Sequence, residues 1–328
     1  MSHALRLVRG GDLKQAMAVI QQGLRADAPR VDVIDEPVPD AAPATPAGQR
    51  FESLSHTSQA GTRQYRLFVP ASYRDEPLPL VVMLHGCTQT PEDFAAGTRM
   101  NDLGAEYGFF VAYPAQASAA NPKKCWNWFK RSEQQRERGE PSLIAGIVDD
   151  LRSRYAIDER RVFVAGLSSG GAMAATLAAT YPDVFAAVGV HSGLAHGCAH
   201  DLPSALAAMR GGSAGVAVRG IPTIVFHGDQ DALVHPRNGE EVAAQWMSGK
   251  EQSTVIVDSA LDANGYGYTR RSVHAASPPS RLEHWVIHGA GHAWSGGSPS
   301  GTHTDPKGPD ASREMVRFFF AEDALATP

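Results

Sequence analysis

Short apolar runs recur along the chain from residue 51 onwards, separated by polar or glycine-containing segments. The first two, 51–56 and 63–69, alternate apolar and polar residues on either side of Gln59-Ala60-Gly61, which predicts a β-hairpin. The run 78–85 is instead almost continuously apolar, which is typical of a strand buried on both faces. Five further short apolar runs predict strands at 109–113, 162–165, 186–190, 223–226 and 284–287.

Helical patterns lie between most of these strands. The clearest cover 91–107, 142–155, 169–181 and 239–247. Alternating strands and helices predict an α/β fold, with a mostly parallel twisted sheet and helices on both faces. Ligands bind to such sheets at the carboxyl ends of the strands, so polar residues that follow a strand are the first candidates for a site.

The chain divides into three parts by composition. Residues 1–26 carry an apolar stripe against an Arg, Lys and Gln face and predict a short amphipathic helical segment that docks by this stripe. Residues 27–50 are rich in Pro, Ala and Asp and predict a linker. Residues 51–328 then form the predicted catalytic domain.

Charge and hydropathy argue against several classes of function. The 328 residues carry a net charge of −5 and no basic stripe, which argues against binding to nucleic acid. No apolar stretch is long enough to span a bilayer, and no apolar core of a secretory signal follows Arg6 and Arg9. We therefore expect no membrane association and a cytoplasmic protein, or a secreted one if a leader was removed. No pattern predicts the oligomeric state.

Cysteine and histidine spacings favour neither a disulfide scaffold nor a metal site. The cysteines are Cys87, Cys125 and Cys198, too few for such a scaffold, although one Cys87–Cys125 bridge is compatible with an oxidising compartment. Two histidine groups invite a metal interpretation. They are His284, His288 and His292, and His191, His196 and His200 with Cys198. The first lies on a predicted strand and turn and the second in a polar loop, so we expect no metal and no cofactor.

The candidate nucleophile is Ser168, in the turn Gly166-Leu167-Ser168-Ser169-Gly170. A strand precedes this turn and a helix follows it, the context in which small neighbours expose a strained serine. The same five-residue pattern occurs at Gly211-Gly212-Ser213-Ala214-Gly215, but no apolar strand precedes it. Position along the chain therefore favours Ser168 and makes Ser213 a loop residue.

An acid and a base follow two later strands in the order that this type of turn predicts. Asp229 and Asp231 come after the strand 223–226, and we favour Asp231, with Asp229 as a turn residue. His292 follows the strand 284–287 and a Gly289-Ala290-Gly291 turn. Its imidazole would accept the Ser168 proton, and Asp231 would hold the imidazole in the required tautomer.

The backbone N–H groups of Ser169 and Cys87 are the candidate oxyanion donors. Ser169 begins the helix after the nucleophile, and Cys87 lies in His85-Gly86-Cys87-Thr88-Gln89, directly after the strand 78–85. Gly86 allows the backbone to approach a ligand closely. The role we prefer for His85 is that of a buried, hydrogen-bonding residue that shapes this loop.

These motifs resemble those of the polyhydroxybutyrate-depolymerase-like esterases, relatives of the feruloyl and acetylxylan esterases, over about residues 50–320. The residues that carry the resemblance are 84–89, Tyr113-Pro114-Ala115-Gln116, Cys125-Trp126-Asn127-Trp128-Phe129, 166–171, 227–231 and Gly291-His292-Ala293-Trp294-Ser295-Gly296-Gly297. The resemblance implies an α/β-hydrolase fold. It also implies a triad of Ser168, Asp231 and His292, oxyanion donors at Cys87 and Ser169, and a disulfide between Cys87 and Cys125.

Three further residues beside these motifs are candidates for substrate contact. They are Trp294, Trp126 and His85. Aromatic side chains near a catalytic motif can line an ester pocket, and core packing is the alternative for the tryptophans.

The sequence thus predicts a serine carboxylic-ester hydrolase that works through an acyl-enzyme. Its predicted substrates are short hydroxyalkanoate oligoesters or small esters. One alternative is a feruloyl- or acetylxylan-type esterase acting on plant polysaccharide esters, and another is a non-catalytic binding protein on a hydrolase scaffold. We find neither a signal peptide nor a polymer-binding module in the sequence, which argues against attack on crystalline polymer.

Overall fold

A computed structural model describes residues 48–218, 220–247, 253–262, 265–276 and 279–321. The chain divides into two compact units, 1–44 and 45–328, and the second is described below. The predicted amphipathic segment 1–26 and the predicted linker up to residue 47 lie outside the described residues.

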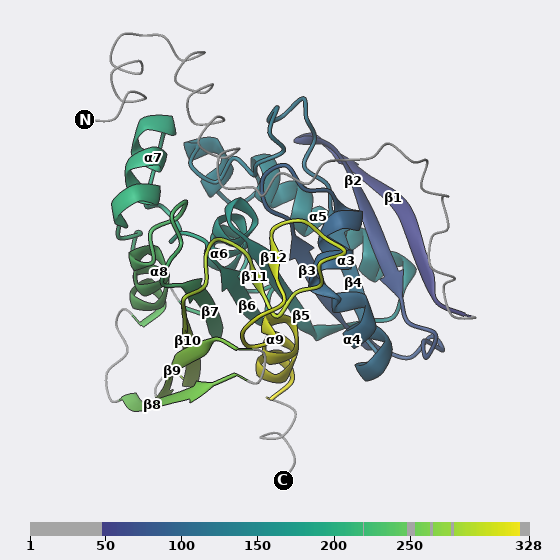
Figure 1. Ribbon diagram of the computed structural model, residues 1–328. Helices are drawn as coiled ribbons and strands as arrows, with labels where there is room; N and C mark the ends of the chain where they lie inside the picture. The colour runs from purple at the N-terminus through teal and green to yellow at the C-terminus, as the bar shows by residue number, and fades with distance from the viewer. Residues whose placement is uncertain (1–47, 219, 248–252, 263–264, 277–278, 322–328) are drawn as a thin grey trace, which may run out of the picture. The chain divides into compact units, whose positions relative to one another are not determined.

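A ten-stranded sheet forms the centre of this unit (Figure 1). The strands are β1 Arg50–Ser58, β2 Gly61–Val69, β3 Leu78–Leu84, β4 Phe110–Pro114, β5 Ile157–Leu167, β6 Ala187–His191, β7 Thr223–Gly228, β8 Ser253–Leu261, β9 Gly267–Ala276 and β10 Pro279–His288. They lie in the order β1-β2-β4-β3-β5-β6-β7-β10-β9-β8. The strands from β4 to β10 in this order are parallel, and an antiparallel hairpin completes each edge. Two short strands, β11 Trp294–Ser295 and β12 Thr304–Asp305, pair with each other.

Helices cover both faces of the sheet, as the alternating pattern predicted. They are α3 Pro91–Thr98, α4 Met100–Tyr107, α5 Gly139–Arg154, α6 Ser169–Thr180, α7 Leu202–Gly211, α8 Arg237–Met247 and α9 Ala311–Phe320, with a short 3-10 helix at Arg131–Gln134. Helices α5 to α8 contribute to the core on one face, and α3, α4 and α9 contribute to the core on the other.

Strand β3 is apolar throughout because both of its faces are buried. Leu80 and Leu84 belong to the core on the side of α5 to α8. Val81 and Met83, which point to the opposite face, belong to the core on the side of α3, α4 and α9. The continuous apolar run thus has the cause that the sequence predicted.

The predicted helix 91–107 is two helices in the structure. Arg99 interrupts it with a φ of 54°, and its N–H donates to the Ala95 carbonyl at 3.0 Å, which ends α3. The Arg99 guanidinium donates to the Gly296 carbonyl and to the Asp310 carboxylate at 3.0 and 2.8 Å. Hydrogen bonds to residues far along the chain thus stabilise the interruption between α3 and α4.

The sequence also did not predict the helices α7 and α9 or the strands β8 and β9.

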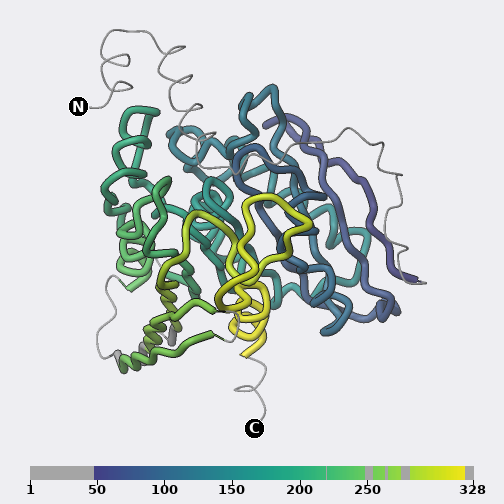
Figure 2. The backbone as a smooth tube through the Cα atoms, in the orientation of Figure 1, coloured from purple at the N-terminus to yellow at the C-terminus, as the bar shows by residue number. Residues whose placement is uncertain are grey.

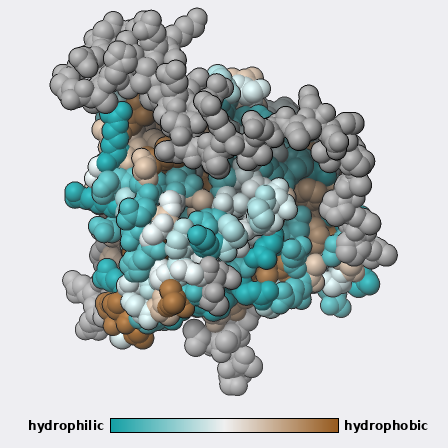
Figure 3. Space-filling view, in the orientation of Figure 1, coloured by the Kyte–Doolittle hydropathy of each residue, from teal (hydrophilic) through white to brown (hydrophobic). Residues whose placement is uncertain are grey.

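The edge strand β8 carries an exposed apolar surface. Val255, Ile256, Val257 and Leu261 are all exposed. Figure 3 shows brown, hydrophobic atoms gathered at the lower left, where Figure 1 places β8. The polar residues of the candidate site follow the central parallel strands instead. No helix in the described ranges has the length and apolar character needed to cross a bilayer.

Candidate active site at the carboxyl ends of the parallel strands

Ser168 forms a sharp turn between β5 and α6. Its φ and ψ are 57° and −118°, a backbone conformation that serine rarely adopts and that marks strain at functional turns. Its N–H donates to the carbonyl of His191 at 2.9 Å, which ties the turn to the end of the neighbouring strand β6. Ser168 precedes the helix, but its side chain forms no capping hydrogen bond. The hydroxyl is therefore not used to build the helix.

Two glycines allow this turn to pack. A Cβ atom at Gly170 would overlap the carbonyl oxygens of Leu84 and His85, and one at Gly166 would overlap Gly170 itself. The first turn of α6 consequently lies directly against the end of β3. This contact brings the Ser169 N–H, at the start of the helix, close to the loop that follows β3.

His292 and Asp231 form a hydrogen-bonded pair. The His292 Nδ1 and Asp231 Oδ2 atoms are 2.7 Å apart, and the Asp231 side chain is fully buried. Asp229 binds different partners, because it accepts from the Gly289 N–H at 2.8 Å and lies 3.1 Å from His288 Nδ1. The structure thus brings the favoured acid to the favoured base and places Asp229 against the turn after β10.

The surroundings of Asp231 keep it ionised. Burial alone raises the pKa of this carboxyl, but hydrogen bonds and charge interactions with His227 and His292 outweigh it and hold the pKa well below its usual range. The second oxygen, Oδ1, accepts from the N–H groups of Leu233 and Val234 at 2.9 and 2.8 Å. An ionised Asp231 on Nδ1 leaves Nε2 of His292 as the nitrogen that can exchange a proton.

The segment that follows His292 forms a loop in the yellow part of the tube in Figure 2, and hydrogen bonds join it to the ends of β6 and α3. The Ser295 N–H donates to the ring Nε2 of His191 at 3.0 Å, and the Ser298 N–H donates to the Gly97 carbonyl at 2.8 Å. His191 therefore binds Ser168 through its carbonyl and the segment after His292 through its ring. Within the described part of the chain, the Ser168 hydroxyl and His292 form no hydrogen bond with each other.

His85 fixes the peptide that joins Gly86 to Cys87. Its Nε2 accepts from the Gln116 N–H at 3.1 Å, so its proton is on Nδ1, which donates to the Gly86 carbonyl at 2.7 Å. Burial lowers the pKa of His85 to about 4, which keeps the ring neutral. In a trans peptide the Cys87 N–H points opposite to the Gly86 carbonyl. Among the described residues, neither this N–H nor that of Ser169 has a hydrogen-bond acceptor.

A disulfide joins Cys87 to Cys125, with the two Cα atoms 4.2 Å apart. It connects the loop after β3 to the segment after β4. The third cysteine, Cys198, is a buried thiol, and burial raises its pKa to about 12. Ser169 Oγ lies 3.4 Å from the Cys87 sulfur, which again places the start of α6 beside this loop.

The two tryptophans predicted to contact substrate are core residues instead. Both Trp294 and Trp126 are 0% exposed. The Trp294 indole N–H donates to Ser312 Oγ at 3.0 Å, and its ring packs against Phe94 and His191. The prediction that they line a substrate pocket is therefore wrong, because packing in the two cores encloses both rings.

His85, the third candidate for substrate contact, is also buried but borders a cavity of about 250 Å³. Gln64, Thr90, Ala115 and Lys124 contribute to its walls. The substrate contact of His85 stays a prediction. Its hydrogen bonds to Gly86 and Gln116 are those of a residue that shapes the loop.

The second copy of the serine pattern lies in another setting. Ser213 follows the helix α7, and its hydroxyl donates to the Cys198 carbonyl at 3.0 Å. The histidines of the group His284, His288 and His292 do not converge on one point, since His288 and His292 bind different aspartates. No cluster of metal-ligand side chains occurs within the described ranges.

Gln89 is a site residue that the sequence did not single out. Its side-chain oxygen accepts from the Gly86 N–H at 2.9 Å, and its amide nitrogen donates to Asp93 and to the Thr302 carbonyl at 2.8 and 2.9 Å. It thus ties the loop after β3 to the segment that follows His292. Its position at the end of the motif 84–89 was the only signal in the sequence for such a role. Its bond to Thr302 could not be predicted, because Thr302 lies 213 residues away along the chain.

Comparison with known proteins places these features in a family. Residues 63–274 match the model of a family described as "Esterase PHB depolymerase". The chain is 34% identical over 245 residues to poly(3-hydroxyalkanoate) depolymerase C of Paucimonas lemoignei, an alignment that covers 70% of this chain and 56% of that protein. It is 32% identical over 202 residues to feruloyl esterase B of Neurospora crassa, which covers 55% and 68% of the two chains.

A solved structure of similar fold is the acetyl xylan esterase from Aspergillus awamori. It is 24% identical to this chain, with a TM-score of 0.57, over 74% of this chain and 94% of that one. This likeness confirms the predicted α/β-hydrolase fold. The chain itself spans only 56% of the length of the Paucimonas relative.

Proposed function

Because the chain belongs to the esterase family of the PHB depolymerases, we propose that it hydrolyses carboxylic esters with Ser168 as nucleophile, His292 as base and Asp231 as its acid partner. The mechanism requires no cofactor. The observation that carries the proposal is the Asp231–His292 pair, which lies at the same end of the sheet as a strained serine turn and two unbonded N–H groups.

The reaction proceeds in two halves. His292 Nε2 removes the Ser168 proton while Ser168 Oγ attacks the ester carbonyl, and the resulting oxyanion accepts hydrogen bonds from the Cys87 and Ser169 N–H groups. The imidazolium then gives its proton to the leaving alcohol, and the acyl group stays on Ser168. A water molecule, deprotonated by His292, then attacks the acyl carbonyl. The bond between the acyl carbon and Ser168 Oγ breaks, the acid is released, and the His292 imidazolium returns the proton to Ser168 Oγ. Substrate binding draws the Ser168 hydroxyl and His292 into hydrogen-bond distance.

Short hydroxyalkanoate oligoesters are the proposed substrates. The 34% identity to a poly(3-hydroxyalkanoate) depolymerase supports this choice. Feruloyl esters are the second candidate, because a feruloyl esterase is 32% identical. Catalytic efficiencies on hydroxybutyrate dimers and trimers, ethyl ferulate and acetylated xylan separate these classes. Higher efficiency on the ferulate or the xylan ester than on every hydroxybutyrate oligomer would reject the first choice.

Ser168→Ala tests the nucleophile, and Ser213→Ala is its matched control from the same five-residue pattern. We expect Ser168→Ala to lower kcat on p-nitrophenyl butyrate by more than about a thousandfold, because no acyl-enzyme can form. Ser213→Ala should keep kcat within about twofold, since its hydroxyl binds only a loop carbonyl. Full activity in Ser168→Ala would reject the assignment. A wild type without any turnover would favour a binding protein.

A further inference from the structure

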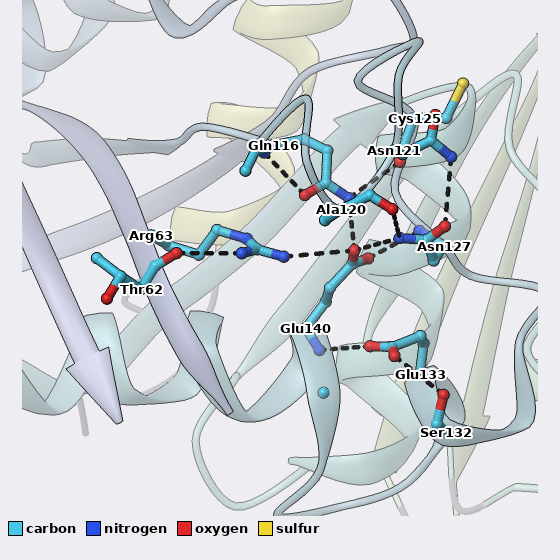
Figure 4. Close-up of polar contacts among 12 residues, drawn as sticks. Thr62, Arg63, Gln116, Ala120, Asn121, Cys125, Asn127, Ser132, Glu133 and Glu140 are labelled. Carbon is cyan, nitrogen blue, oxygen red and sulfur yellow. Dashed lines mark hydrogen bonds and ion pairs between the residues drawn. The ribbon is translucent and has the colours of Figure 1, made fainter. Parts of the chain in front are cut away.

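Glu140 is a buried carboxylate outside the proposed triad, and polar side chains converge on it (Figure 4). Its Oε1 accepts from the side-chain amides of Gln116 and Asn127 at 2.5 and 2.6 Å. Its Oε2 accepts from the Asn127 backbone N–H at 2.7 Å. The Arg63 guanidinium lies 3.5 Å away and is itself buried. Glu140 thus binds both ends of the segment 116–127.

One end of this segment leads to the proposed oxyanion loop through Gln116. The backbone N–H of Gln116 donates to His85 Nε2, and His85 Nδ1 donates to the Gly86 carbonyl. Gln116 is therefore held by Glu140 through its side chain while it fixes the tautomer and position of His85 through its backbone. The Gly86 carbonyl in turn sets the direction of the Cys87 N–H.

The other end of the segment reaches the same loop through Cys125 and Trp126. Gln116 Nε2 also donates to the Cys125 carbonyl at 2.9 Å, and Cys125 is bonded to Cys87 through the disulfide. Trp126, directly before Asn127, donates from its indole to the His85 carbonyl at 3.1 Å. The segment therefore holds the loop on both sides of the Gly86–Cys87 peptide.

We propose that Glu140 is the positioning residue of the oxyanion hole, acting on the Cys87 N–H through Gln116, His85 and the segment that carries Cys125. Glu140 touches no substrate and exchanges no proton in this role. The inference rests on the proposed function, because it assigns the Cys87 N–H to the oxyanion.

A carboxylate suits this position better than a neutral side chain. Three N–H donors point at its two oxygens, so both oxygens must accept. Burial raises the pKa of Glu140, and the hydrogen bonds from Gln116 and Asn127 act against this rise. Glutamine in the same place would turn an NH₂ group towards one of these donors and leave a buried hydrogen bond unmade. One end of the segment would then shift, and the Cys87 N–H with it.

The test compares Glu140→Gln with wild type, and Glu283→Gln is the matched control. Glu283 is also a buried carboxylate, but it binds Trp285 and Arg317, away from the loop after β3. Active sites are counted by labelling with a fluorophosphonate, and kcat per labelled site is measured on p-nitrophenyl butyrate. The Ki of a trifluoromethyl ketone, which forms a tetrahedral adduct with the serine, reports the oxyanion hole directly.

Loss of one oxyanion donor lowers kcat by about a hundredfold to a thousandfold, so a displaced donor should lower it by about tenfold or more. We expect this loss in kcat per labelled site and a matching rise in Ki for Glu140→Gln, with KM within about twofold. Glu283→Gln should change neither quantity. A purely structural role would reduce the labelled fraction or the melting temperature and leave kcat per site and Ki unchanged, and that result would overturn the proposal.

A second variant covers the case in which Glu140→Gln does not fold. Gln116→Met removes the side-chain donor to Glu140 and Cys125 but keeps the backbone N–H that binds His85, so kcat per site should fall and Ki should rise by smaller factors. Unchanged values in this folded variant would also overturn the proposal. Failure of the proposed function gives a different result, because wild type itself would then neither label nor turn over.

Discussion

Asp229 and Asp231 are two residues apart after β7, and hydrogen-bond geometry distinguishes them. Asp231 reaches His292 Nδ1 at 2.7 Å with a fully buried side chain, whereas Asp229 binds the turn after β10. The sequence could place an acid after this strand and favour the second of the two. Only the folded turn shows that Oδ1 of Asp231 accepts from two backbone N–H groups, which leaves Oδ2 to face His292.

Asp231→Asn and Asp229→Asn should therefore behave very differently. The amide at position 231 would favour the wrong tautomer of His292 and should lower kcat by about ten-thousandfold. Asp229→Asn keeps an acceptor for the Gly289 N–H and should lower kcat by less than about tenfold. Both values are read from p-nitrophenyl butyrate turnover per fluorophosphonate-labelled site. Equal and mild losses in the two variants would contradict the assignment of Asp231.

Side-chain burial was less predictable than side-chain chemistry. Trp294 follows His292 by two residues, and proximity in sequence suggested the pocket. Its indole instead bonds Ser312 in α9 and packs against Phe94 in α3. Both partners belong to other elements, and Phe94 lies far from Trp294 along the chain, so no local pattern around Trp294 could have indicated its burial. Glu140 was missed for a similar reason, because its partners belong to other elements.

The junction of β5, Ser168 and α6 is the element that sets the position of the nucleophile. Gly170 is needed there because a Cβ would overlap the carbonyl oxygens at the end of β3. Gly211, at the end of α7, is the contrasting case, since a Cβ would meet nothing within 4 Å. Both lie in copies of the same five-residue pattern, Gly170 as the last residue of one copy and Gly211 as the first residue of the other, the position that Gly166 holds in the copy with Gly170. Their packing, rather than the pattern, determines what each can tolerate.

Gly170→Ala should destabilise the protein by about 1–3 kcal/mol, because the start of α6 must move away from β3. The same movement displaces Ser168 and the Ser169 N–H, so kcat should fall by at least about tenfold. Gly211→Ala should be neutral or stabilise by up to about 1 kcal/mol through helix propensity. Urea unfolding and kcat per labelled site check both. Equal stabilities for the two variants would show that the close approach at Gly170 is relaxed in solution.

The elements that could be predicted are those that carry their own apolar signal. Strand β3 and the other central strands have runs buried on both faces, so their positions could be read from the sequence. Strands β8 and β9 form the hairpin at one edge of the sheet. The apolar run of β8, Val255-Ile256-Val257, is exposed, and β9 is mixed in polarity, so neither strand has a run buried on both faces. Strand β10 was predicted only at 284–287. Its pairing with the central strand β7 begins at Leu282, and its first residues pair with β9 alone, so they lack the apolar run of a central strand.

The whole molecule buries several neutral histidines. Burial lowers the pKa of His85, His196 and His284 to about 4 and that of His191 to about 3. Charge interactions with His227 and Arg271 lower the pKa of His284 further. An unfolded chain would protonate each of these rings near about pH 6.5. The folded state therefore binds fewer protons than the unfolded state between about pH 6.5 and about pH 4.

This difference in bound protons determines whether the free energy of unfolding rises or falls with pH. The four neutral rings cost no stability above about pH 6.5, because both states are then deprotonated. As the pH falls towards about 4, the unfolded state gains protons that the folded state cannot bind, and each ring lowers the free energy of unfolding by about 1.4 kcal/mol per pH unit. Unfolding in urea at several pH values should therefore show a steep loss of stability across this window.

His284→Leu tests the contribution of one of these rings. It removes one group that takes up a proton on unfolding. The slope of the free energy of unfolding against pH should therefore decrease by the contribution of about one proton. The variant should lose little stability at pH 7, because the buried His284 Nε2 has no hydrogen-bond partner within the described residues. The exposed His200 supplies the matched control as His200→Leu, which should leave the slope close to that of wild type. A slope in His284→Leu equal to that of wild type would mean that His284 takes up its proton equally in the folded and unfolded states, and the burial argument would then fail for this ring.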